Sequence, residues 1–548
     1  MEKYMADCRY VATSEEYADF IVNWTGSNEE AVNNFDVDCF QRISGIYGTI
    51  FRPLRDVRAL SLRNYRFNEI PALYGLMERD IRVRSSNLQS ALDVSGIISL
   101  QRQPTLQLKG QGCIMAFIDT GINIDDDEFR FGNGDTRILR LWDMTDETGT
   151  PPEGIVFGSE YNTEDINNIL KENGRPGRDE IGHGNYLARI GAGKSGAVPE
   201  CQIVVVKLKP AKAYLREYYH IESDAVAYQE NDIMLAVNYV RSVAQEYKMP
   251  VSLCLALGTN GRSHDGRSAL SFILDTFVSD TGAVISVAGG DEGNKQLHSS
   301  GNIDIDNEPV NVELRVAEGQ DGLMINIWGD EAEVLSVGLI SPTGEVVPRI
   351  PVRVGKSETY NLVFDRTTVV IEYDLVEGDS GDELILINLM NPTAGVWTIQ
   401  IYGENILTGR YNVYLPISQF LKDETYFLSP DPEITLTDPA YARYAITSVG
   451  FEPDDGALYL ENGRGFARDN AIKPDIATTL SVAITAGASC QFLNWGIVNG
   501  NDTQLRSSDI KSYLIRGAIR RGNITYPSRE WGFGSLDVYR SFERLRGQ

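Results

Sequence analysis

Three segments of the sequence contain the residue types that nucleophilic catalysis uses. Asp119 ends the apolar run at 113–119 and begins a DTG motif, and His183 lies further along the chain between two glycines. A third segment, rich in small and hydroxyl-bearing residues, follows the KPDIA motif at 473–477. Because a carboxylate can orient an imidazole that takes a proton from a hydroxyl group, these segments could form one acid–base–nucleophile site.

The apolar pattern around these motifs predicts the elements that must position them. Continuous apolar runs alternate with amphipathic stretches, which predicts an α/β fold with a parallel sheet covered by helices on both faces. Binding sites in such folds lie at the carboxyl ends of the strands, where Asp119 is expected. The strand-like runs lie at 113–119, 203–209, 250–258 and 282–290, and the helix-like stretches at 231–247 and 268–280.

The pattern changes after about residue 305. Short strand-like runs follow one another with turn-like gaps and no helical period, which predicts an antiparallel β-sandwich inserted into the α/β unit. The α/β pattern resumes at 442–450 and continues into helix-like stretches at 478–495 and 507–520. The first 90 residues are predicted to form a small mixed α+β segment.

Composition limits the classes of partner. The chain has 548 residues with 50 Lys and Arg against 77 Asp and Glu, a formal net charge of −27. So acidic a chain should repel nucleic acids and anionic membranes. No apolar stretch is long enough to span a bilayer, and the first residues lack the pattern of a signal peptide. We therefore expect a protein of the cytoplasm.

Cysteine and histidine spacing gives no sign of a metal or redox centre. The six cysteines form no CxxC pair, so we expect all of them to be reduced and to act as small core residues. The four histidines show neither ligand spacing nor an HExxH motif, so no metal and no cofactor is expected.

Taken in order, the DTG, GHG and KPDIA motifs resemble those of the subtilisin-like serine protease family. Longer segments, among them RILRLWDMT, GRGFARDNAIKPDIA and YPSREWGFGSLDVYRSF, resemble the Csp-type clostridial subtilases of spore germination and their Firmicutes relatives. The resemblance implies a subtilisin-like α/β core, an N-terminal α+β prodomain and an inserted all-β jelly-roll. The expected boundaries are 1–90 for the prodomain-like segment, 91–305 and 421–548 for the core, and 306–420 for the jelly-roll.

By this resemblance, Asp119 is the orienting acid and His183 the general base. The family's spacing, counted back from Gly487, places Thr479 at the position of the nucleophile, whereas an alignment of LSVA with the family motif places Ser481 there. We favour Thr479, because the Ser481 register would turn the following helix by roughly 200° and expose the wrong face. The extra methyl group of a threonine would crowd the attack geometry.

Other positions depart from the family pattern. Asp291 occupies the position of the oxyanion-hole asparagine, and losing such a donor lowers the rate by about 10²–10³. Ala256, Leu257 and Gly258 replace the family's SLG edge at the first specificity pocket. The loop that normally lies between KPDIA and the nucleophile is missing. We therefore predict a catalytically degenerate pseudoprotease, with an active Csp-like serine endopeptidase that cleaves a precursor during germination as the alternative.

The resemblance also implies partners. A pseudoprotease of this type would act as a regulator, sensor or partner in germination signalling, with an active homologous subtilase as its protein partner and packaging in the spore. A small-molecule germinant is a further candidate. An active member would cut away its own prodomain near residues 85–95, whereas an inactive one would keep it attached.

Two further motifs have simpler interpretations. GDSG at 378–381 mimics the nucleophile motif of the chymotrypsin family, but it lies in a polar gap between two strand-like runs and is interpreted as a flexible acidic turn. The acidic cluster at 125–128 lacks the alternation of a calcium loop and is interpreted as a solvated turn, with an opportunistic cation site as the alternative.

Overall fold

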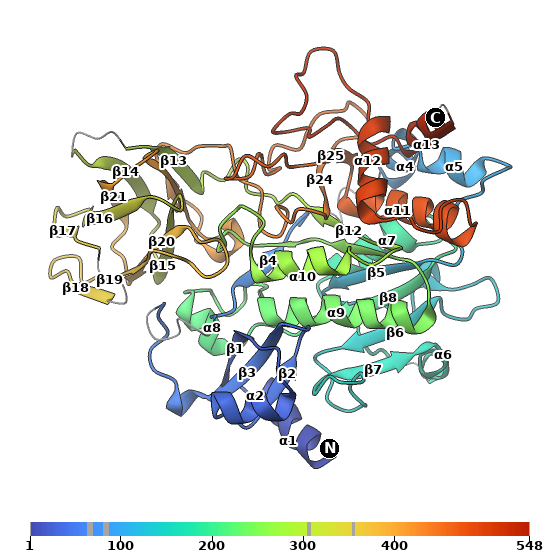
Figure 1. Ribbon diagram of the computed structural model, residues 1–548, viewed down its shortest axis with the longest axis horizontal. Helices are drawn as coiled ribbons and strands as arrows, with labels where there is room; N and C mark the ends of the chain where they lie inside the picture. Colours follow the sequence, from blue (N-terminus) through green and yellow to red (C-terminus); the bar gives the residue numbers. More distant parts are fainter. Residues whose placement is uncertain are drawn as a thin grey trace.

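A computed structural model describes residues 2–62, 69–80, 87–172, 174–303, 308–352 and 357–546. Its centre is an eight-stranded sheet flanked by helices, with the N-terminal unit and a β-sandwich attached at its sides (Figure 1). All neighbouring strands of the central sheet are parallel except the edge pair β6 and β7. In spatial order the strands are β25 (Ile476–Thr479), β24 (Ile446–Phe451), β12 (Ala283–Ala288), β10 (Val251–Leu255), β5 (Ile114–Asp119), β8 (Gln202–Lys207), β6 (Ile138–Asp143) and β7 (Ser159–Asn162).

Helices cover both faces of this sheet, so the predicted α/β fold class is confirmed. Alternate side chains of the central strands point into two separate hydrophobic cores, as the pleat of a strand requires. One core contains α9 (Glu230–Tyr247) and α10 (Ala269–Phe277); the other contains α4 (Leu88–Val94), α5 (Ile97–Arg102), α7 (His183–Ala192), α11 (Val482–Leu493), α12 (Ser507–Gly517) and α13 (Val538–Arg546). Smaller helices are α6 (Thr163–Lys171) and α8 (Ala213–Tyr218).

Two antiparallel sheets pack on a third core to form the inserted β-sandwich. Their inner faces are built from alternating Val, Ile and Leu, which is typical of strands that bury one face. One sheet has the order β13 (His298–Asn302), β22 (Arg410–Tyr414), β15 (Gly322–Gly329), β20 (Glu383–Met390), β19 (Thr368–Asp374), β18 (Ser357–Asn361). The other has the order β17 (Val346–Ile350), β16 (Val334–Ile340), β21 (Gly395–Asn405), β14 (Val310–Val316), β23 (Tyr426–Phe427).

The N-terminal unit combines two helices with a three-stranded antiparallel sheet. The sheet has the order β1 (Tyr17–Asn23), β3 (Tyr47–Pro53), β2 (Phe40–Arg42), and the helices are α1 (Glu2–Thr13) and α2 (Asn28–Phe35). A further three-stranded sheet joins this unit to the core: β4 (Leu73–Leu76) lies between β9 (Tyr228–Gln229) and β11 (Leu257–Gly258). The chain therefore returns from the N-terminal unit into the core as a strand.

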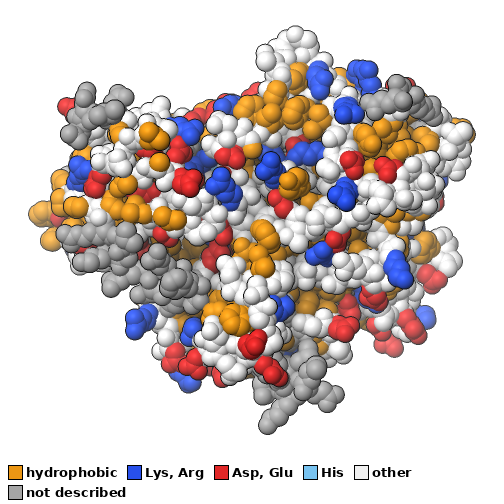
Figure 2. Space-filling view, in the orientation of Figure 1, with side chains coloured by type: hydrophobic (Ala, Val, Ile, Leu, Met, Phe, Trp, Pro, Cys, Tyr) orange, Lys and Arg blue, Asp and Glu red, His pale blue; other side chains and the backbone are white. Residues whose placement is uncertain are grey.

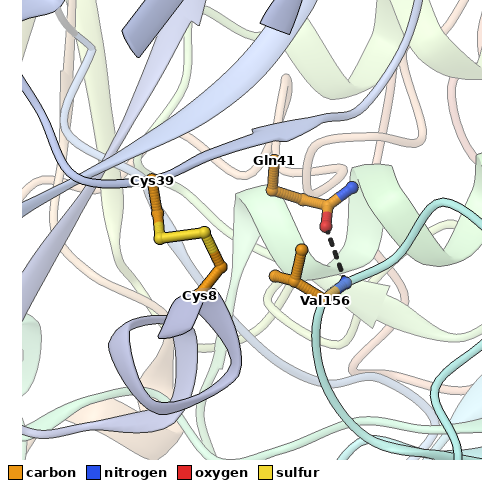
Figure 3. The surroundings of a disulfide bond; sticks show 4 residues. All are labelled: Cys8, Cys39, Gln41 and Val156. Atoms are coloured by element: carbon orange, nitrogen blue, oxygen red, sulfur yellow. Dashed lines mark hydrogen bonds between the residues drawn. A yellow bond between two sulfur atoms is a disulfide. The ribbon is translucent and has the colours of Figure 1, made fainter. Parts of the chain in front are cut away.

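The expectation that every cysteine is reduced is wrong for one pair. Cys8 and Cys39 form a disulfide that joins α1 to the segment before β2 (Figure 3). The fold brings their Cα atoms to 5.5 Å, a distance that a disulfide spans, although 31 residues separate them in sequence. The other cysteines are free and buried, as predicted: Cys113, Cys201, Cys254 and Cys490.

The predicted helix at 478–495 begins later than expected. Residues 478 and 479 belong to β25, and α11 starts at Val482 with Ser481 as its N-cap. Paired β-branched threonines favour a strand, and serine is a preferred N-cap because its hydroxyl accepts a backbone N–H, here that of Ala483. Every residue of α11 is buried, so burial cannot distinguish one rotation of this helix from another.

A buried ion pair holds the N-terminal unit on the core. Asp19 of β1 is 2.6 Å from the ammonium group of Lys212, and both side chains are almost fully buried. Gln229 donates a hydrogen bond to the other Asp19 oxygen at 2.9 Å, so the carboxylate is satisfied on both sides.

Within the described residues no helix has the length and apolar character needed to cross a membrane.

We predict that Lys212→Ala lowers the free energy of unfolding of the N-terminal unit by about 3–5 kcal/mol, because it leaves Asp19 charged and buried without its partner. Native-state hydrogen exchange of the β1 amides measures this loss. Lys109→Ala is the control, since Lys109 pairs with Glu200 on the surface and should contribute less than about 1 kcal/mol. Equal effects of the two variants would contradict the prediction.

Candidate functional site

Asp119 and His183 meet at the carboxyl edge of the central sheet. Asp119 is the last residue of β5, His183 is the first residue of α7, and both are buried. His183 Nδ1 lies 2.8 Å from Asp119 Oδ1. Gly184 permits this approach, because a Cβ there would lie 2.5 Å from the carbonyl oxygen of Gly121. The structure thus brings together the two residues that the sequence predicts as acid and base.

The second ring nitrogen of His183 faces the chain's own N-terminal segment. Nε2 lies 2.7 Å from the carbonyl oxygen of Met77. Burial disfavours the charged ring, but Asp119, the Met77 carbonyl and Glu78 together outweigh it and raise the pKa of His183 to about 9. The ring is therefore an imidazolium at neutral pH, and both N–H groups donate. A ring in this state has no lone pair with which to act as a base.

Residues 73–77 lie in the site as an extended strand. Gly75 and Leu76 of β4 pair with β11, and the Met77 N–H donates to the Ala256 carbonyl at 2.9 Å. Residues 256–258, predicted to line a specificity pocket, thus hold a peptide backbone by strand addition. The Met77 side chain is fully buried. The occupant of the groove is the chain itself.

Glu78 and Ser481 are in direct contact at the start of α11. The Ser481 hydroxyl donates to one Glu78 oxygen at 2.5 Å, and the Val482 N–H donates to the other at 2.8 Å. A carboxylate is favourable at this position because the N-terminus of a helix carries partial positive charge. Ser481 is therefore the hydroxyl-bearing residue that the helix presents next to the Met77–Glu78 segment.

Thr479, which the sequence register favours as the nucleophile position, is not brought to this site. It lies in β25, and its hydroxyl donates to the carbonyl of Ala91 at 2.9 Å. The argument against Ser481 assumed that α11 has one buried face, but α11 is buried on all sides. The Ser481 register is the one that the local structure supports.

Asp291, which the sequence predicts at the oxyanion position, lies at this site as a hydrogen-bond acceptor. Asp291 follows β12, and its Oδ2 accepts the N–H of Arg79 at 3.2 Å. The N–H of Ser481 donates back to the Thr479 carbonyl at 2.7 Å, across Leu480 with a φ of 64°. Stabilising an oxyanion requires donors aimed at the developing charge. Asp291 is a carboxylate and has no donor to offer. The Ser481 N–H is a donor, but it is already bonded to the Thr479 carbonyl.

Three residues of this site were not predicted from the sequence: Met77, Glu78 and Arg79. Processing was expected near 85–95, but the segment at the site is 73–79. No local signal distinguishes it, because its role depends on pairing with β9 and β11, which are distant in sequence.

The GDSG turn and the acidic cluster at 125–128 are held by hydrogen bonds and ion pairs to neighbouring side chains. Ser380 of the GDSG turn donates its hydroxyl to Glu377 at 2.8 Å. In the acidic cluster, each aspartate pairs with an arginine: Asp125 with Arg175, Asp126 with Arg189 and Asp127 with Arg130. Among the described residues no group of His, Cys, Asp and Glu is arranged to hold a metal ion.

Comparison with known proteins gives a strong structural match. The sequence matches no family model and no curated protein. The chain is similar to the CspB protease of Clostridium perfringens, with a TM-score of 0.74 and 25% identity over 84% of this chain and 98% of that chain. Weaker matches are fervidolysin from Fervidobacterium pennivorans (TM-score 0.40, 11% identity, 96% of this chain and 61% of that one) and Apa1 from Pseudoalteromonas sp. AS-11 (TM-score 0.32, 8% identity, 83% and 98%).

The raised pKa of His183 predicts a pH-dependent stability. A pKa of about 9 in the folded chain, against an ordinary value near 6.5, corresponds to about 3 kcal/mol of stabilisation. This contribution is fully present below about pH 6.5 and is lost as the pH rises through about 9. Urea unfolding across this range measures it, and His183→Gln should remove this contribution and leave that of the other titrating groups. His220→Gln, which changes a ring whose pKa is lowered, is the control and should leave it intact.

Proposed function

We propose that this chain, which belongs by its fold to the subtilisin-like proteases, is a catalytically degenerate member that acts by binding rather than by peptide hydrolysis. The observation that carries the proposal is the hydrogen bonding of His183. One ring nitrogen bonds Asp119 and the other bonds the Met77 carbonyl. A general base must accept the proton of the nucleophile, and this ring is engaged on both sides.

Two features near Ser481 support the same proposal. Its hydroxyl donates to Glu78, so the hydroxyl proton is directed away from a base that would activate it. Asp291 stands in place of a hydrogen-bond donor to the tetrahedral intermediate, and the loss of such a donor lowers the rate by about 10²–10³. Repulsion between its carboxylate and the negative charge of the intermediate would lower the rate further. The short connection from β25 to α11 also lacks the loop expected before a nucleophile.

The proposed role is that of a regulator, sensor or partner in spore germination signalling. The support is the sequence resemblance to Csp-type subtilases and the likeness to the CspB protease. On the face drawn in Figure 2, Lys and Arg side chains are dispersed among acidic and apolar ones, as suits a protein partner rather than a nucleic acid. The partner proposed is an active homologous subtilase, with a small-molecule germinant as a further input.

The alternative is an active endopeptidase that its own segment 73–79 keeps inhibited. It is favoured by the intact Asp119–His183 hydrogen bond and by the position of Ser481 as the N-cap of α11. In that case, removal of the segment would release the base and the nucleophile together.

We predict that a fluorophosphonate probe does not label Ser481, either in the native chain or after trypsin has cut at the exposed Arg79. Asp291→Asn should not restore labelling, because it supplies one donor and leaves His183 engaged. Mass spectrometry of the adduct is the measurement, with Ser481→Ala as the matched control and an active subtilisin as the positive control. Labelling that appears after the trypsin cut and disappears in Ser481→Ala would support the endopeptidase instead.

The intact mass gives a second prediction. The purified chain should remain at 60.8 kDa, because a site without a free base cannot cut the Met77–Glu78 bond that lies within it. Storage at about pH 9, where about half of the His183 rings lose their proton, should not change this result, because Asp291 still opposes negative charge at the proposed oxyanion position. A cut between residues 77 and 78 that Ser481→Ala prevents would contradict the proposal.

A further inference from the structure

A cavity of about 500 Å³ lies where the N-terminal unit, the core and the β-sandwich meet. This size suits a small organic molecule. None of Asp119, His183 and Ser481 lines it, so it is separate from the site described above. Its walls contain six aromatic side chains contributed by all three parts: Trp24, Phe35, Tyr47, Tyr218, Tyr219 and Trp328.

Negative charge is in excess at this cavity. Among the described residues four carboxylates line it, those of Glu69, Asp374, Glu377 and Asp379, together with one cation, Arg262. That cation is already committed, since it pairs with Glu69 at 2.5 Å and also with the buried Glu230. Burial, followed by repulsion from Glu377, raises the pKa of Asp379 to about 7. A positive charge placed in the cavity would relieve this repulsion.

Asp379 is fixed in place by the GDSG turn. Its Oδ2 accepts the N–H of Ala269, at the start of α10, at 3.0 Å. The turn itself is held by Ser380, whose carbonyl accepts from Arg267 at 2.7 Å and whose hydroxyl donates to Glu377. The turn, interpreted from sequence as flexible, is therefore held by several hydrogen bonds, and it positions the Asp379 carboxylate at the cavity wall.

Trp328 adds an independent sign of a ligand. The side chain is 2% exposed and lines the cavity, and within the part of the chain that the structure describes its indole N–H has no hydrogen-bond partner. A buried indole N–H usually finds an acceptor, because leaving it unsatisfied is unfavourable. A ligand that carries a hydrogen-bond acceptor would satisfy it.

We propose that this cavity is a binding site for a small organic cation, with an ammonium group beside Asp379 and Glu69, an aromatic body among the six rings, and an acceptor for Trp328. Aromatic faces attract cations, so the rings and the carboxylates favour the same charge. Because the walls come from three parts of the fold, such a ligand would stabilise their association. The proposal does not rest on the catalytic state of Ser481.

The test uses two probes that differ in charge alone at one end. Tyramine has an aromatic ring, a hydroxyl acceptor and an ammonium group, whereas hydroxyphenylpropionate carries a carboxylate instead of the ammonium. We expect calorimetry on the full chain to give tyramine a dissociation constant below about 1 mM and to detect no binding of the carboxylate. Quenching of tryptophan fluorescence should follow tyramine binding, since Trp24 and Trp328 line the cavity.

Asp379→Asn should weaken tyramine binding by at least about tenfold, because one buried charge partner is lost. Trp328→Phe keeps an aromatic ring but removes the indole N–H, so it should weaken tyramine binding by a smaller factor than Asp379→Asn. Glu164→Gln, on the exposed first turn of α6, is the control and should have no effect. Thermal unfolding checks that each variant is folded.

Three outcomes would overturn the proposal: equal binding of the two probes, tyramine binding that Asp379→Asn leaves unchanged, or no binding of tyramine, phenethylamine and butylamine up to about 10 mM. None of these outcomes alters the labelling result at Ser481, so failure of the binding proposal can be distinguished from failure of the proposed function.

Discussion

The hydrogen bond between His183 Nε2 and the Met77 carbonyl is the interaction on which the state of this protein depends. It occupies the second ring nitrogen of His183, whose pKa is raised to about 9 mainly by Asp119 and further by Met77, and it exists because β4 pairs with β9 and β11 and delivers Met77 to the ring. The same segment carries Glu78 to Ser481 and the Arg79 N–H to Asp291. Three consecutive residues thus bond His183, Ser481 and Asp291 together.

Buried polar groups make this arrangement durable. The Tyr74 hydroxyl of β4 donates to Asp438 at 2.9 Å, and Glu230 accepts the Ala72 N–H at 3.1 Å. With the ion pair between Asp19 and Lys212, these contacts tie the N-terminal segment to the core at several points. Each group is nearly or fully buried, so separating the two parts would leave charges and donors without partners. The N-terminal unit is in this sense part of the core.

Prediction from sequence succeeded where a local pattern decides the outcome. The parallel sheet follows from apolar runs that alternate with helices, and the pairing of Asp119 with His183 follows from motifs at a strand end and a helix start. It could not choose between Thr479 and Ser481, because a helix that is buried on all sides has no periodicity to set its register. It failed for the Cys8–Cys39 disulfide too, since no spacing rule predicts which strands come together.

The sequence by itself determined the fold class, and its motifs predicted that Asp119 and His183 lie together at the carboxyl edge of the sheet. Only the tertiary structure decided that residues 73–79 fill the site, that Ser481 rather than Thr479 adjoins it, and that the GDSG turn borders an acidic, aromatic cavity. The physical reason is common to all three. Each depends on contacts between residues far apart in the chain, whose energies come from packing and burial in the folded state rather than from local propensity.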